Sequence, residues 1–159
     1  MSDTKISVLV GSASDLGLIA DSGMYKVFDA VGIDVPLHVI SAHRNVPELE
    51  AHNRESGTDV YIAAAGVAAA LPGAVAANTR FRKVVIGVPL DEYGIDTCIR
   101  LPSGVPVLTA GVGKAGLRNA AISACQIAAL NSPEIAEKLA AHLDAEAAGR
   151  PAQLNVQRP

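Results

Sequence analysis

The stretch ISVLVGSASDLG, residues 6–17, decides the fold. Its first five residues are almost continuously apolar and rich in β-branched side chains, which is typical of a strand buried on both faces of a parallel sheet. Gly11 and then Ser14 and Asp15 follow at once, and serine and aspartate are the residue types that begin helices. The stretch therefore predicts a strand that turns directly into a helix, which is the repeating unit of an α/β fold.

The same alternation continues along the chain. Further strands are predicted over residues 35–40, 60–64, 84–88 and 105–110. Helical patterns cover residues 14–31, 46–56, 68–78 and 117–130, with a mixed segment at 91–101 and a last helix over 133–148. Five such units predict a three-layer, doubly wound parallel sheet with five strands and a C-terminal helix. We expect residues 1–149 to form one domain and residues 150–159 to be a tail.

Composition limits the classes of function. Half of the 159 residues are hydrophobic, which excludes a disordered chain, and the net charge is −3 without any basic block. Nucleic-acid binding is therefore not expected. The sequence has no apolar run of about 20 residues, so no membrane span is expected, and no signal peptide is evident at the start. Cys98 and Cys125 are isolated, which favours the reducing cytoplasm.

Small side chains dominate the sequence. It contains 28 alanines and 14 glycines but only five aromatic residues. Small side chains bury little area each, so a lone unit of this size would have a thin core. Burial of surface between subunits would compensate, and we therefore expect a homo-oligomer.

The first candidate loop is GSASD, residues 11–15. In parallel sheets, ligands bind beyond the carboxyl ends of the strands, where this loop is expected to lie. A glycine, two hydroxyls and free amides at a helix start make a cradle for an anion. Asp15 could accept hydrogen bonds from ribose hydroxyls. The alternative is an ordinary helix cap that binds nothing.

The second candidate loop is SAHR, residues 41–44, after the second predicted strand. Arg44 offers a planar fork for a phosphate or carboxylate, and Ser41 adds a further donor. His43 can transfer a proton near neutral pH. In the alternative interpretation, Arg44 pairs with Glu48 one helical turn later and His43 is only half-buried.

The third loop, residues 64–73, contains no acid, base or metal ligand. Its small residues, with Gly66 among them, would let the main chain lie close to a flat ring; the alternative is tight packing of helix on sheet. The G-x-G-x-x-G at 111–116 follows the last strand, so we interpret it as a glycine-rich helix start and not as a dinucleotide site. The histidines and cysteines have no metal-binding spacing, and the two cysteines are expected to be core thiols.

Taken together, five motifs resemble those of the PurE family: GSASD at 11–15, SAHR at 41–44, AAGxxxxLPG at 64–73, VIGVP at 85–89 and AGxGxAGxxNAA at 110–121. The resemblance implies a flavodoxin-like fold, assembled as an octamer with active sites at subunit junctions. It implies an N5-carboxyaminoimidazole ribonucleotide mutase or an aminoimidazole ribonucleotide carboxylase of purine synthesis. The substrates would be a ribonucleotide and CO2, with no metal and no cofactor.

The resemblance also implies a role for each site residue. The phosphate would be held by Ser12, Ser41 and Arg44, and the ribose by Asp15. His43 would be the catalytic proton-transfer residue. The aminoimidazole and its carboxylate would be framed by Ala65, Gly66, Ala70 and Leu71.

One of these positions departs from the family pattern, because Ala70 stands where a second histidine is usual. A methyl group neither hydrogen-bonds a carboxylate nor relays a proton. Two further hypotheses therefore stay open. One is a carboxylase or decarboxylase of another nucleotide-linked heterocycle, as in the PurE-like domain of pyridinium dicarboxylate mononucleotide synthase. The other is a catalytically silent nucleotide-binding homologue.

Overall fold

The computed structural model describes residues 4–150 and 152 and contains one five-stranded sheet. The strands are β1 (Ile6–Val10), β2 (Leu37–Val39), β3 (Val60–Ala65), β4 (Val84–Pro89) and β5 (Leu108–Thr109). They are all parallel and lie in the order β2-β1-β3-β4-β5. The predicted doubly wound parallel sheet is confirmed, and its strand order reverses between β1 and β3, which is where such folds bind ligands.

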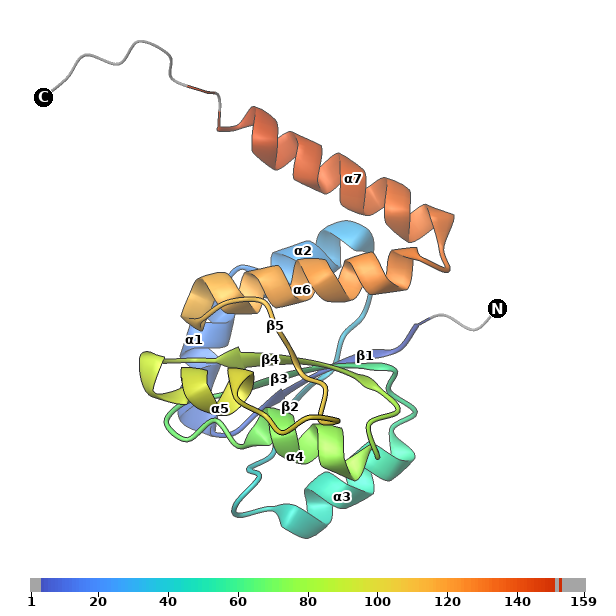
Figure 1. Ribbon diagram of the computed structural model, residues 1–159. Coiled ribbons are helices and arrows are strands. Elements are labelled where there is room, and N and C mark those ends of the chain that lie inside the picture. Colours follow the sequence, from blue (N-terminus) through green and yellow to red (C-terminus); the bar gives the residue numbers. More distant parts are fainter. Residues whose placement is uncertain (1–3, 151, 153–159) are drawn as a thin grey trace, which may run out of the picture.

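Helices cover both faces of the sheet (Figure 1). One face carries α1 (Leu16–Asp21), α2 (Met24–Val31) and α6 (Gly113–Ala129). The other carries α3 (Val46–Glu55), α4 (Leu71–Asn78) and α5 (Ile95–Ile99). The last helix, α7 (Pro133–Ala148), packs on α2 and α6, outside the layer that touches the sheet.

The core follows the two-residue period of the strands. In β1, Val8 and Val10 belong to the apolar cluster under α2 and α6, whereas Leu9 belongs to the cluster under α3 and α4. On α6, Ala120 and Ala124 are fully buried. Their small side chains let the helix approach the sheet closely, so many of the alanines serve packing within the subunit.

The structure differs from the sequence prediction where the backbone enters the left-handed region. The prediction of a single helix over 14–31 is wrong. A 3-10 turn (Ala13–Asp15) precedes α1, and Gly23 with φ 75° separates α1 from α2. The helix expected from residue 68 begins at Leu71 instead, because Val67 and Ala69 have φ of 50° and 37°.

Other differences concern the ends of elements. The edge strands β2 and β5 are shorter than predicted, because each pairs with one neighbour only. The mixed segment consists of a 3-10 turn (Glu92–Gly94) followed by α5. The helix predicted from residue 117 begins at Gly113, inside the G-x-G-x-x-G, which confirms that this motif is a helix start.

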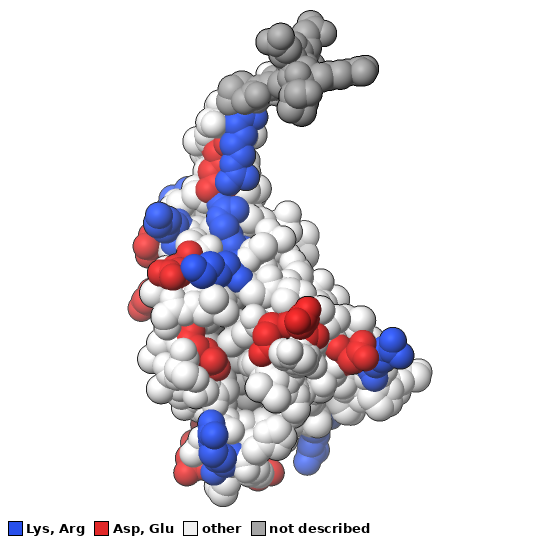
Figure 2. Space-filling model, turned by 90° about the vertical axis from the view of Figure 1, so that its left-hand side faces the viewer, with Lys and Arg blue, Asp and Glu red and all other residues white. Residues whose placement is uncertain are grey.

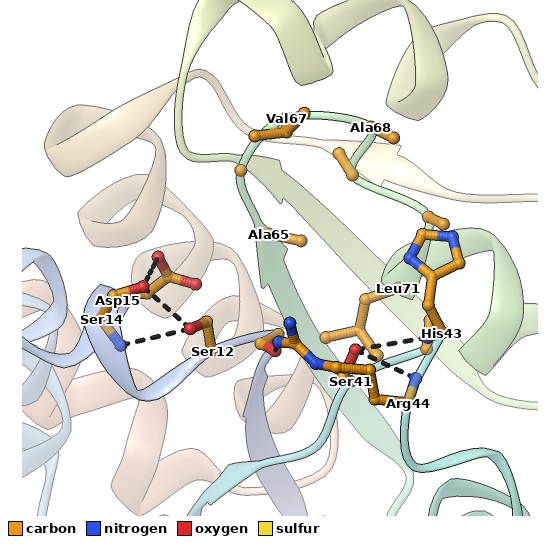
Figure 3. Close-up of a pocket in the computed structure, with 15 residues that line it drawn as sticks. Ser12, Ser14, Asp15, Ser41, His43, Arg44, Ala65, Val67, Ala68 and Leu71 are labelled. Atoms are coloured by element: carbon orange, nitrogen blue, oxygen red, sulfur yellow. Dashed lines mark hydrogen bonds between the residues drawn. The ribbon is translucent and has the colours of Figure 1, made fainter.

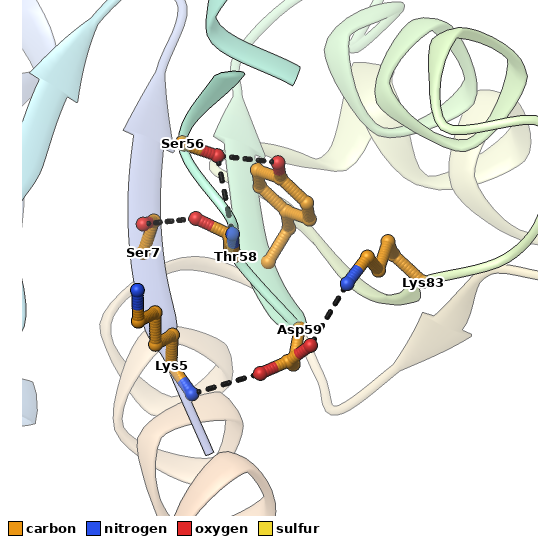
Figure 4. Close-up of polar contacts among 7 residues, drawn as sticks. Lys5, Ser7, Ser56, Thr58, Asp59 and Lys83 are labelled. Carbon is orange, nitrogen blue, oxygen red and sulfur yellow. Dashed lines mark hydrogen bonds and ion pairs between the residues drawn. The ribbon is translucent and has the colours of Figure 1, made fainter. Parts of the chain in front are cut away.

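Polar contacts tie the strands together at the end of the sheet where they begin (Figure 4). The hydroxyls of Ser7 and Thr58 lie 2.8 Å apart in a buried position. Asp59 accepts a hydrogen bond from the Lys5 backbone N–H at 3.1 Å and from the Lys83 ammonium at 2.8 Å. These contacts link the starts of β1, β3 and β4, so the opposite ends of the strands emerge in a fixed register.

Three other expectations concern the rest of the chain. Of the expected tail, only Arg150 and Ala152 belong to the part that the structure describes, so the prediction largely lies outside it. Within that part, no helix has the length and apolar character to cross a membrane. Cys98 and Cys125 are buried free thiols, as predicted, and burial raises the pKa of each to about 11.

Candidate active site

A pocket of about 340 Å³ opens at the carboxyl ends of β1, β2 and β3. Three loops line it, and they are the three loops that the sequence singled out. The structure brings every predicted site residue to this pocket: Ser12, Asp15, Ser41, His43, Arg44, Ala65, Gly66, Ala70 and Leu71. Residues separated by as many as 59 positions in the sequence thus face one cavity.

The loop after β1 is held by a hydroxyl cap. The Ser12 Oγ accepts the Ser14 N–H at 3.3 Å and the Ser14 hydroxyl at 2.8 Å. It therefore caps the 3-10 turn, as the alternative interpretation predicted, yet it also lines the pocket. Its own hydroxyl proton stays available to a ligand. The cap and the anion cradle are thus compatible.

The loop after β2 is a tight turn around Ser41, which is only 7% exposed. Its Oγ accepts the backbone N–H groups of His43 and Arg44, each at 3.3 Å. The Asn45 side-chain oxygen accepts the Ser41 N–H at 3.1 Å. Because these bonds fix the backbone at 43 and 44, they also set the directions in which the imidazole and the guanidinium leave it.

A hydrogen bond joins the first two loops. The Arg44 Nη2 donates to the Gly11 carbonyl at 3.3 Å, and the guanidinium reaches across the pocket toward Ser12 (Figure 3). The predicted alternative, an Arg44–Glu48 pair, is not among the ion pairs of residues 4–150. A guanidinium has five N–H donors, so most of them remain free for an anion.

Residues 66–70, which we call the wall loop, close the third side of the pocket (Figure 3). Its side chains are all methyl or isopropyl groups apart from Gly66, so any polar contact to a ligand comes from its backbone. The His43 ring is exposed and stands on the side of the pocket where Leu71 follows the wall loop. A ligand in the pocket would therefore meet an imidazole edge and an apolar wall together.

Some pocket residues were not predicted. Ser14, Val67 and Ala68 also line the cavity. Ser14 lies inside the motif that identified its loop, so the signal was present. Val67 and Ala68 lie in the predicted third loop but were harder to single out, because the sequence predicted a helix from residue 68 where the structure has a turn.

Charge near the site is mixed. Figure 2 shows the face at the left of Figure 1, where α1 and α5 follow their strands. Much of its lower half is uncharged, with small separate groups of acidic and basic side chains.

No group of three or more His, Cys, Asp or Glu that could hold a metal ion occurs among the described residues.

Comparisons with known proteins agree on one family. The family described as AIR carboxylase matches residues 5–148. An N5-carboxyaminoimidazole ribonucleotide mutase of Pyrococcus abyssi is 40% identical over 144 residues, covering 85% of this chain and 79% of the relative. One of Methanocaldococcus jannaschii is 40% identical over 139 residues, covering 84% and 85%. The crystal structure of Treponema denticola PurE has a TM-score of 0.78 at 26% identity, covering 92% of this chain and 93% of that one.

Proposed function

Because the chain belongs to the AIR carboxylase family, we propose that it interconverts N5-carboxyaminoimidazole ribonucleotide and 4-carboxyaminoimidazole ribonucleotide in purine biosynthesis. The observation that carries the proposal is the Arg44–Gly11 hydrogen bond. It joins the two loops that bear anion donors, and it does so beside an exposed imidazole.

The polar side of the pocket suits a ribose phosphate. The Arg44 guanidinium, with the hydroxyls of Ser12 and Ser41, would supply charged and neutral donors to the phosphate oxygens. Asp15 lines the same end of the pocket and would accept hydrogen bonds from the ribose hydroxyls. Binding energy from these remote contacts would then hold the reacting ring in place.

The apolar side suits the aminoimidazole. Ala65 and Leu71 are buried, and Gly66 and Ala70 complete a surface without bulky side chains. A planar ring could lie against this surface and be held by backbone groups. Small apolar walls also suit CO2, which carries no net charge and would otherwise diffuse into water.

His43 would carry the proton that the reaction must move. Cleavage of the N5–carboxyl bond releases CO2 and leaves an electron pair on N5, which takes a proton from the imidazolium. The ring carbon C4 then attacks CO2, and its hydrogen leaves as a proton to the neutral imidazole. One proton is given and one is recovered, so His43 ends each turnover as it began. Among the described residues that line the pocket, His43 carries the sole imidazole.

A direct assay tests the proposal. Purified protein is mixed with either carboxylated ribonucleotide, and with aminoimidazole ribonucleotide plus bicarbonate, and ultraviolet absorbance follows the conversion. We expect interconversion in the wild type and its loss in His43→Asn, with ribonucleotide binding retained. His142→Asn removes an imidazole from α7 and serves as the matched control.

The outcomes separate the open hypotheses. Conversion only of aminoimidazole ribonucleotide with bicarbonate would identify a direct carboxylase. Binding without turnover would identify a silent homologue, and no binding would indicate another heterocycle as substrate. Unchanged turnover in His43→Asn would remove this histidine from the mechanism.

We further propose that the protein acts as a homo-oligomer in the cytoplasm, an octamer as the resemblance implies. Several large apolar side chains are exposed in the single chain, including Tyr93 at 77%, Ile99 at 57% and Leu108 at 55%. Burial between subunits would remove this surface from water. A monomer in sedimentation at micromolar concentration would refute the assembly.

A further inference from the structure

We propose that Asp91, which does not line the pocket, is a positioning residue that holds the wall loop in the conformation that receives the substrate ring. The proposal rests on the proposed function, because it concerns the same pocket. Asp91 itself lies in the turn after β4, outside all five family motifs, whereas the wall loop belongs to the motif at 64–73.

Asp91 uses both carboxylate oxygens on backbone donors from two different loops. One oxygen, Oδ1, accepts the N–H groups of Tyr93 and Gly94, at 3.0 and 3.1 Å, and so caps the local 3-10 turn. The other, Oδ2, accepts the Val67 N–H at 2.8 Å, across 24 residues of sequence. Asp91 is therefore the polar link between its own turn and the wall loop.

Two glycines allow the turn and the wall loop to approach this closely. A Cβ on Gly66 would lie 2.8 Å from the Asp91 carboxylate oxygen. A Cβ on Gly94 would lie 2.8 Å from the Ala69 Cβ and 3.1 Å from the Val67 carbonyl oxygen. The two 2.8 Å distances are shorter than real Cβ contacts, so Gly66 makes room for the carboxylate and Gly94 for the Ala69 methyl group.

The wall loop needs such a restraint because its backbone is strained. Val67 and Ala69 have φ of 50° and 37°, a region that L-residues avoid and that suits a β-branched side chain least. Ala69 is buried, so packing holds it. Val67 is 71% exposed in the single chain, so packing within this chain does not hold it. Its N–H bond to Asp91 opposes relaxation of this residue, beside the bond from the Ala69 N–H to the Gly66 carbonyl at 3.1 Å that closes the turn.

A relaxed wall loop would move the surface on which the ring is expected to lie. Ala70 and Leu71 follow directly and line the pocket, so a change at Val67 would be transmitted to the ring-binding surface. Displacement of a bound ring by about 1 Å can reduce the rate about 100-fold. Asp91 would thus act on catalysis through the loop and without touching substrate.

The test compares Asp91→Ala in two backgrounds. In the wild-type background we expect kcat/KM to fall by about 10- to 100-fold. In the Val67→Gly background the same substitution should cost only a few-fold, because glycine adopts this φ without steric strain. Asp96→Ala on α5 removes an exposed carboxylate that pairs with Arg100 and is the matched control, with unchanged kcat/KM.

A purely structural role makes a different prediction. If Asp91 only caps its own turn, Asp91→Ala would lower kcat/KM by the same factor in both backgrounds, or would lower Tm equally in both without changing kcat/KM. Either result would show that the proposal is wrong. Unaltered kcat/KM in Asp91→Ala would also overturn it.

A second readout does not depend on the reaction. Hydrogen exchange at the Val67 amide should accelerate in Asp91→Ala and not in Asp96→Ala. Should the wild type prove inactive, the proposed function fails while this measurement still reports on the restraint. If exchange at Val67 did not change, the restraint itself would be disproved.

Discussion

Substitution of Arg44 by alanine tests the geometry of the pocket most directly. The guanidinium is exposed, and its bond to the neutral Gly11 carbonyl is 3.3 Å long, so that bond contributes little by itself. The large effect should appear with a phosphate in place, where charge-assisted hydrogen bonds are worth about 1.5–3 kcal/mol. This range corresponds to an increase of about 10- to 150-fold in the Kd of the ribonucleotide.

Titration calorimetry with two ligands isolates the phosphate contribution. Arg44→Ala should weaken aminoimidazole ribonucleotide by the factor above and leave its dephosphorylated nucleoside almost unaffected. Arg44→Lys keeps the charge but loses the planar fork, so its Kd should be intermediate. Arg100→Ala removes an exposed arginine from the end of α5 and should change neither affinity. An equal loss for nucleotide and nucleoside would refute the assignment of Arg44 to the phosphate.

Three predictions concern stability and reactivity. Gly94→Ala should lower the free energy of unfolding, measured in thermal melts, by about 1–3 kcal/mol, because the new methyl would lie 2.8 Å from the Ala69 methyl. Gly17 has open space around it, so Gly17→Ala is the control and should be neutral or stabilising. Burial raises the pKa of Cys98 and of Cys125 to about 11, so both thiols should react with a thiol reagent at pH 8 only as fast as the protein unfolds. Because the folded state favours the neutral thiols, their contribution to the free energy of unfolding should be lost as the pH rises from 9 toward 11. A hydrogen bond from Lys83 lowers the pKa of Asp59, so the ionised carboxylate stabilises the folded state. The difference in unfolding free energy between wild type and Asp59→Asn should therefore be complete above pH 4, and it should vanish in acid titrations as the pH falls through the lowered pKa.

The sheet was predictable because its signal is local and repeated. Residues 6–10 show a buried strand within five positions, and the strand bounds match the prediction. The site was predictable for a related reason. Parallel strands end at one edge, so Ser12 and Arg44 had to approach each other once both loops were assigned to strand ends. The parallel topology therefore brings the polar residues of both loops to the same edge of the sheet.

The wall loop could not be predicted in this way. By propensity alanine favours a helix and valine favours a strand, but residues 66–70 form neither element. Val67 is left-handed because a distant carboxylate holds its N–H and because Gly66 and Gly94 leave space for that contact. Such a conformation depends on residues 24 positions away, and no local pattern in the sequence records it.

The arrangement also explains how the pocket could function with Ala70 in place of a second histidine. A histidine on the wall would hydrogen-bond the substrate carboxylate, but in the proposed mechanism the carboxyl group leaves N5 and reaches C4 as neutral CO2. A wall of methyl groups favours that neutral species over its charged precursor, since apolar surface solvates a charge poorly. In the proposed mechanism, orientation would then depend on the phosphate contacts and the backbone of the wall loop, and proton transfer on His43. The loss of one imidazole would therefore increase the demand on the precise shape of the wall, which is the property that Asp91 is placed to maintain.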